Sequence, residues 1–109
     1  MIEVHKKIVD HVGARPDKGF KATLFETPRI MLGMNCLEPG QEQKAHDHPD
    51  QDKFYCVTEG VGEFLVGEAT FTASAGEVVF APAGIAHGVR NASKNRLSML
   101  VGITPWKSI

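Results

Sequence analysis

Two histidines that are one residue apart are the first residues of this sequence that could do chemistry. They lie in the stretch AHDHPDQDKF, residues 45–54, as His46 and His48. On a β-strand this spacing places both imidazole rings on one face, where their nitrogens can bind the same metal ion. A third candidate, His87, follows the turn-forming segment APAGIA. A Pro-x-Gly turn can direct the next strand back towards the pair, so we predict that the three histidines converge.

The remaining histidines and the cysteines suggest no second site. His5 and His11 belong to a polar N-terminal segment, and we assign them no role. Cys36 and Cys56 each lie in an apolar run that is typical of a strand, and neither belongs to a CxxC pair. This pattern indicates buried, reduced thiols that pack as small apolar side chains, rather than a disulfide or zinc ligands.

Length and composition bound the class of protein. The chain has 109 residues, a formal net charge of −1, 42% hydrophobic residues and 23% charged residues. These values are typical of one globular domain, which we take to be residues 1–109. The sequence has no clustered basic segment for nucleic acid and no apolar run near the roughly 20 residues of a membrane-spanning helix. Its N-terminus lacks the apolar stretch of a signal peptide, so we expect a soluble, cytoplasmic protein.

Short runs of β-forming residues alternate with glycine and proline turns along most of the chain. Examples are RIMLGMNCL, GEFLVG, EVVFAPA and LSMLVGI, and the pattern is typical of an all-β sandwich or barrel. We expect less than about a fifth of the residues to be helical, with at most a helical turn within residues 1–12. Residues 1–25 are predicted to form an arm or edge strand before the barrel. The segment VTEGVGEFLVG predicts a hairpin that turns near Glu59–Gly60.

Two of the runs, FYCV and SMLVGI, are apolar on both faces of the predicted strand. A strand of an antiparallel sheet with one solvated face should instead alternate between apolar and polar residues. The outer face of the barrel is therefore expected to be covered. In so short a chain a second subunit is the simplest cover, and we predict a homodimer.

The spacing of glycine, proline and histidine around the candidate ligands is more specific than the histidines themselves. Residues 40–60 read Gly40-x5-His46-x-His48 and end at Gly60, and residues 76–91 read Gly76-x5-Pro82-x-Gly84-x2-His87-x3-Asn91. The two patterns resemble the two signatures of the cupin family. The short segment between them is similar to that of small single-domain bacterial cupins. The resemblance covers about residues 36–104, which is most of the chain.

The resemblance implies an antiparallel double-stranded β-helix, the jelly-roll barrel of cupins, built as a single domain. It also implies one divalent metal ion (Mn, Fe, Ni or Zn) held by His46, His48 and His87 together with a carboxylate. Counting from Gly60 places the carboxylate at position 53, where this chain has Lys53. An ammonium group cannot take over the role of the carboxylate, because it repels a dication.

Three arrangements are open for the residues around Lys53. In the first, Lys53 points out of the barrel or bends aside, and the three histidines alone hold the metal. In the second, a bulge lets Asp52 or Gln51 take the place of the acid, although strand alternation alone puts Asp52 on the opposite face. In the third, no metal is bound, and Lys53 is a cation in the cavity that binds an anionic group of a ligand or pairs with a carboxylate. We favour them in this order.

The implied barrel encloses a pocket for a small-molecule ligand, with inward strand residues as its walls. If Lys53 faces inward, so do Tyr55 and Val57, and the Tyr55 hydroxyl is then the best polar contact for the ligand. Two functions fit the resemblance. One is a metal-dependent enzyme for a small organic molecule, such as a dioxygenase, isomerase or lyase. The other is a non-catalytic binding or sensing module, with or without metal.

Overall fold

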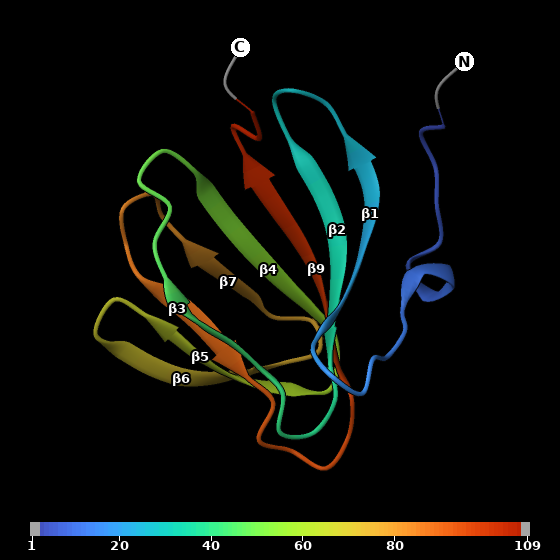
Figure 1. Ribbon diagram of the computed structural model, residues 1–109, viewed down its shortest axis with the longest axis vertical. Coiled ribbons are helices and arrows are strands. Elements are labelled where there is room, and N and C mark those ends of the chain that lie inside the picture. Colours follow the sequence, from blue (N-terminus) through green and yellow to red (C-terminus); the bar gives the residue numbers. More distant parts are fainter. Residues whose placement is uncertain (1–2, 108–109) are drawn as a thin grey trace.

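Two facing antiparallel sheets make up the fold of the computed structural model, which describes residues 3–107 (Figure 1). The larger sheet has the strand order β1-β2-β9-β4-β7, and the smaller sheet has the order β3-β8-β5-β6. The strand bounds are β1 Phe20–Glu26, β2 Met31–Leu37, β3 Glu42–His46, β4 Asp52–Glu59, β5 Val61–Val66, β6 Ala69–Ser74, β7 Val78–Ala81, β8 His87–Arg90 and β9 Leu97–Thr104. The predicted all-β jelly-roll barrel is confirmed.

Helical structure within residues 3–107 is confined to the short 3-10 turn η1, Ile8–His11. Its position agrees with the helical turn predicted within residues 1–12. In this part of the chain no helix has the length and apolar character needed to cross a membrane. The arm predicted for residues 1–25 contains, from Phe20 onward, the edge strand β1, which pairs with β2. Residues 1–2 of that arm lie outside the described range.

The chain crosses from one sheet to the other at Gly60. Strand β4 pairs with β7 and β9, whereas β5 pairs with β6 and β8. The predicted hairpin near Glu59–Gly60 is therefore wrong, because the two strands belong to different sheets. Gly60 has a φ of 81°, and a side chain there would run into the backbone carbonyl of Arg96. Only glycine combines this positive φ with such a close approach of the backbone.

One apolar core packs between the sheets, and β4 shows how the strands contribute to it. Lys53, Tyr55 and Val57 are buried, while the alternate residues Asp52 and Phe54 are exposed and half-buried. Strand alternation therefore turns Lys53 towards the interior. The core comprises Leu37, Tyr55, Val57, Phe64, Ala73, Val79, Ala81, Val89, Leu97, Met99 and Val101.

The two edges of the five-stranded sheet differ in what covers them. At the β1 edge the N-terminal segment lies alongside the strand (Figure 1), and Lys6 donates a hydrogen bond of 2.8 Å to the Leu24 carbonyl. At the opposite edge, β7 exposes 66% of Val78 and 57% of Phe80, which alternate with buried residues of the same strand. Apolar surface thus remains open at the β7 edge, and the homodimer stays a prediction.

Both cysteines are free thiols, as predicted. Cys36 in β2 is buried, and Cys56 in β4 is half-buried. Cys56 alternates with the inward residues Tyr55 and Val57, so its side chain points to the outer face of the sheet. The thiols therefore pack as small apolar groups.

Candidate metal and ligand site

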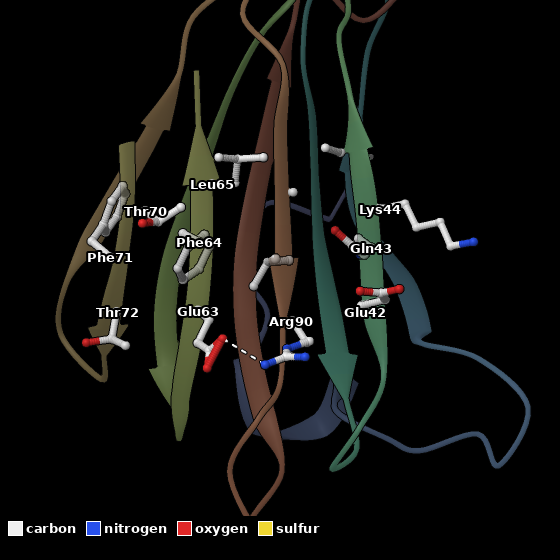
Figure 2. Close-up of a pocket in the computed structure, with 13 residues that line it drawn as sticks. Glu42, Gln43, Lys44, Glu63, Phe64, Leu65, Thr70, Phe71, Thr72 and Arg90 are labelled. Atoms are coloured by element: carbon white, nitrogen blue, oxygen red, sulfur yellow. Dashed lines mark hydrogen bonds and ion pairs between the residues drawn. The ribbon is translucent and has the colours of Figure 1, made fainter. Parts of the chain in front are cut away.

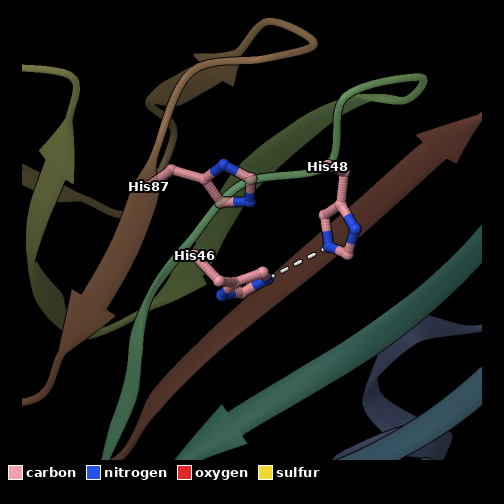
Figure 3. Close-up of side chains that lie close together, drawn as sticks. All are labelled: His46, His48 and His87. Atoms are coloured by element: carbon pink, nitrogen blue, oxygen red, sulfur yellow. Dashed lines mark hydrogen bonds between the residues drawn. The ribbon is translucent and has the colours of Figure 1, made fainter.

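The three histidines that the sequence marks as metal ligands meet at one point (Figure 3). The Nε2 atoms of His46 and His48 are 3.1 Å apart. One ligand nitrogen from each of the three rings lies within 4.8 Å of the other two. Two nitrogens bound about 2.1 Å from one ion, at right angles or tetrahedrally, are roughly 3.0–3.4 Å apart. The pair of His46 and His48 already has this separation.

Strands β3 and β8 place His46 opposite His87, and a loop supplies His48. His46 and His87 are partners in the antiparallel pair of β3 and β8. Strand β3 ends at His46, so the expectation that His46 and His48 share a strand face is wrong. The Gly84 N–H donates a hydrogen bond of 3.0 Å to the His48 carbonyl, which ties the loop to the turn before His87. The strand pair thus brings His46 to His87, and the loop contact holds His48 beside the turn that leads to His87.

Backbone carbonyls hold two of the rings in the state that a metal requires. The Nδ1 atom of His46 lies 2.8 Å from the Lys44 carbonyl oxygen, and that of His87 lies 3.0 Å from the Ile85 carbonyl oxygen. A carbonyl only accepts, so each Nδ1 carries a proton and each Nε2 is an acceptor, which at His46 faces the Nε2 of His48. The His87 Nε2 is buried and has no hydrogen-bond partner among the described residues. A metal ion would satisfy it.

The electrostatic surroundings also favour neutral imidazoles. Burial is the largest cause that lowers the pKa of both His48 and His87. The hydrogen bond to the Ile85 carbonyl opposes this effect at His87, and the Asp47 carboxylate opposes it at His48. The charges of His46 and of the Lys53 ammonium lower the pKa of both rings further. Metal ions bind the neutral form of histidine. The donor set therefore fits one divalent ion that keeps open positions beside three nitrogen ligands.

Lys53 points into the barrel, so the outward orientation in the first arrangement is wrong. The residue is 6% exposed, and its Nζ atom lies 4.6 Å from the centroid of the Tyr55 ring. No ion pair found within residues 3–107 includes Lys53. Burial, assisted by the charge of Lys21, lowers the pKa of Lys53 to about 8. The position of the missing carboxylate is thus filled by a buried cation.

Asp52 and Gln51 bond to backbone groups away from the histidines. This contradicts the second arrangement, in which one of them takes the place of the acid ligand. The exposed Asp52 accepts a hydrogen bond of 2.8 Å from the Ala83 N–H. The Gln51 amide donates to the carbonyls of Pro105 and Trp106, each at 3.0 Å. Strand β4 pairs with β9 without a register shift from Asp52 to Val57, so no bulge turns Asp52 inward.

Two further polar side chains point into the interior without partners. The Tyr55 hydroxyl and both polar atoms of the Gln43 amide are buried and unpaired among the described residues. The Tyr55 and His87 ring centroids are 6.3 Å apart, and burial raises the pKa of the Tyr55 hydroxyl, which keeps it a neutral donor. The inward Tyr55 agrees with the sequence prediction, whereas Gln43 was missed. Alternation places residues 43 and 46 on opposite faces, but a register shift between them turns both inward.

An open trough of about 550 Å³ lies on the outer face of the four-stranded sheet (Figure 2). Gly88 is one of its lining residues, and an ion pair of 3.1 Å joins two others, Arg90 and Glu63. Its other lining residues include Glu42, Lys44, Leu65, Thr70 and Thr72, and none of the three histidines is among them. The trough is therefore distinct from the interior pocket that the sequence predicts.

Comparisons with known proteins agree with this fold. The family described as "Cupin domain" matches residues 33–103. An uncharacterised protein of Streptomyces coelicolor, SCO3923, is 34% identical over 79 residues, which span 72% of this chain and 73% of that protein. The structure of TT1209 from Thermus thermophilus is 37% identical, with a TM-score of 0.90 over 93% of this chain and 96% of that one. A double-stranded β-helix protein from Klebsiella pneumoniae shares the fold at 21% identity, with a TM-score of 0.88 and coverage of 95% and 91%.

Proposed function

This chain belongs to the cupin domain family, and we propose that it binds one divalent metal ion and acts on a small organic molecule. The supporting observation is the convergence of His46, His48 and His87, whose ligand nitrogens lie within 4.8 Å of one another. Three neutral ligands leave coordination positions for water or for a substrate. When bound, the ion would supply a Lewis acid or an oxygen-binding centre.

Side chains of the interior would bind and orient the substrate. The Tyr55 hydroxyl can donate a hydrogen bond, and the Gln43 amide can both donate and accept. The apolar core around them would limit the access of water. A small, partly apolar molecule suits such a pocket. These features support a metal-dependent dioxygenase, isomerase or lyase as the class of enzyme.

A non-catalytic binding or sensing module is the second candidate, and Lys53 is the observation that favours it. Two like unit charges about 4 Å apart repel by about 4 kcal/mol at an effective dielectric constant of 20. A buried ammonium therefore weakens the binding of a dication nearby. Without metal, the same interior could bind a ligand through Lys53 and Tyr55.

Metal analysis of the natively purified protein tests the metal site. By inductively coupled plasma mass spectrometry we expect about one ion per chain in the wild type, and its loss in His48→Ala and His87→Ala. His11→Ala is the matched control, because it removes a histidine of η1, and it should keep the ion. A wild type that neither carries metal nor takes it up on reconstitution would contradict the proposal, as would a His48→Ala variant with full metal content.

Turnover separates the two candidate functions. The metal-loaded wild type is incubated with a panel of small organic molecules, and oxygen uptake and product formation are followed. Turnover that is lost in His48→Ala supports the enzyme. A ligand that binds tightly without any conversion supports the binding module.

A further inference from the structure

A metal ion bound by the three histidines would leave the site with an excess of positive charge. The three ligands are neutral imidazoles, and position 53 carries an ammonium where the cupin pattern has a carboxylate. Lys53 is 6% exposed and belongs to no ion pair found within the described range. Buried charges without counter-charges are costly, so an anion bound from outside the chain would stabilise the site.

Lys53 and the histidines face the same interior space. The neighbours of Lys53 across the sheet are Ala81 and Ile103, which are apolar and buried. The next inward residue of β4 is Tyr55, whose ring centroid is 4.6 Å from the Lys53 Nζ and 6.3 Å from the His87 ring centroid. Tyr55 therefore neighbours both the ammonium and the His87 ring. Of the carboxylates near the site, Asp47 is exposed and raises the pKa of His48, and Asp52 bonds to Ala83 on the outer side, so neither is paired with Lys53.

We propose that the ligand of this site is a small organic carboxylate, bound with its negative charge between the metal-binding histidines and the Lys53 ammonium. The inference rests on the proposed function and names its class of substrate. The carboxylate of the ligand would supply the charge that the protein itself lacks at position 53. The Tyr55 hydroxyl and the Gln43 amide, both buried without partners, are then hydrogen-bond donors for its oxygens.

The set of donors fits a carboxylate better than a phosphate. One ammonium, one hydroxyl and one amide can bind the two oxygens of a carboxylate, which is planar and carries a charge of −1. A phosphate carries more charge and is usually held by arginines or by several backbone N–H groups. Here Arg90 and Arg96 are paired with Glu63 and Glu59, away from the interior. The apolar neighbours of Lys53 also suit the carbon skeleton of an organic acid.

Calorimetric titration of malonate into protein reconstituted with Ni²⁺ tests the inference. Malonamide is the matched probe, because it has the same skeleton without charge. We expect the wild type to bind malonate well and malonamide poorly. Lys53→Met should weaken malonate binding about 10- to 100-fold, because it removes one charge-assisted hydrogen bond. The same change should not weaken Ni²⁺ binding. Lys44→Met removes an exposed lysine of β3 and should change neither affinity.

Each other outcome has a distinct meaning. Equal malonate affinity in the wild type and Lys53→Met would overturn the inference and leave the metal site intact. Equal binding of malonamide or of inorganic phosphate by the wild type would also overturn it, and this comparison holds even if Lys53→Met does not fold. A wild type that fails to bind Ni²⁺ would overturn the proposed function as well. Metal content measured after each titration excludes removal of Ni²⁺ by the probe.

Discussion

The Lys53 ammonium lies 4.6 Å from the centroid of the Tyr55 ring, inside the barrel. The two residues are two positions apart on β4, so they share its inner face. The Tyr55 ring in turn lies 6.3 Å, centroid to centroid, from the His87 ring. The charge of Lys53 lowers the pKa of both His48 and His87. A metal ion bound at the three histidines would therefore be subject to the charge at position 53.

Lys53→Glu should tighten metal binding. The change replaces a repelling ammonium by a carboxylate at the position where the cupin pattern has its acid, and both effects favour a dication. We expect the affinity for Ni²⁺ to rise at least about tenfold. Competition with a chromophoric chelator measures it. Lys44→Glu, on the exposed side of β3, is the control, and an equal gain in both variants would show a general charge effect.

Lys53→Met should stabilise the metal-free protein near neutral pH. Burial lowers the pKa of Lys53 from 10.5 to about 8, which corresponds to about 3 kcal/mol of lost stability when the group is charged in the folded state. The destabilisation has its full size below pH 8 and disappears as pH rises towards 10.5. Between these values Lys53 keeps its proton in the unfolded chain but loses it in the folded protein, so the folded state gains stability with rising pH.

Urea unfolding of the metal-free wild type and Lys53→Met between pH 7 and pH 10 checks this expectation. The variant should be more stable by up to about 3 kcal/mol at pH 7, and the difference should shrink steadily above pH 8. A difference that stays constant across the range would show that Lys53 keeps its proton when folded.

Gly60→Ala should disrupt the crossing between the sheets far more than Gly40→Ala. Both glycines have a similar positive φ, 81° at Gly60 and 86° at Gly40. A Cβ at Gly40 meets nothing within 4 Å, whereas one at Gly60 meets the Arg96 backbone. Gly40→Ala should cost about 1 kcal/mol through strain at its positive φ, and Gly60→Ala several more. Equal losses in urea unfolding would refute the steric account.

Much of the fold could be predicted from sequence, because glycine and proline turns separate short β-forming runs. That Lys53, Tyr55 and Val57 share one face of β4 also follows from sequence alone. The assignment of β4 and β5 to different sheets could not be predicted, since a glycine between two strands is equally typical of a hairpin. The approach of Arg96 to Gly60 distinguishes a crossing between sheets from a hairpin, and this contact joins segments that are distant in the sequence.

The candidate site was predicted in part. The spacing of His46, His48 and His87 indicated that they converge, and the rings meet. The shared strand face was wrong, because β3 ends at His46 and His48 belongs to the loop. Gln43 was missed because the register shift before His46 reverses the parity of the strand, and no local pattern marks that shift. The orientation of Lys53 depends on burial against β7 and β9, which only the assembled sheet shows.

We expect the protein to be a homodimer that uses the β7 edge of the larger sheet. Val78 and Phe80 are 66% and 57% exposed there, on a strand that has a neighbour on one side only. Phe80→Ser should shift the dimer towards monomer in light scattering at micromolar concentration, whereas Val61→Ser, at an exposed apolar residue of the other sheet, should not. A wild type that is monomeric under these conditions would contradict the expectation.

The position of a bound ion tests the metal site most directly. A crystal of the wild type soaked in Ni²⁺ is measured at the nickel absorption edge, and an anomalous difference map locates the ion. We expect one strong peak about 2.0–2.2 Å from the Nε2 atoms of His46, His48 and His87, with Lys53 outside the coordination sphere. A peak elsewhere, or no peak at the three rings in a fully soaked crystal, would contradict the account.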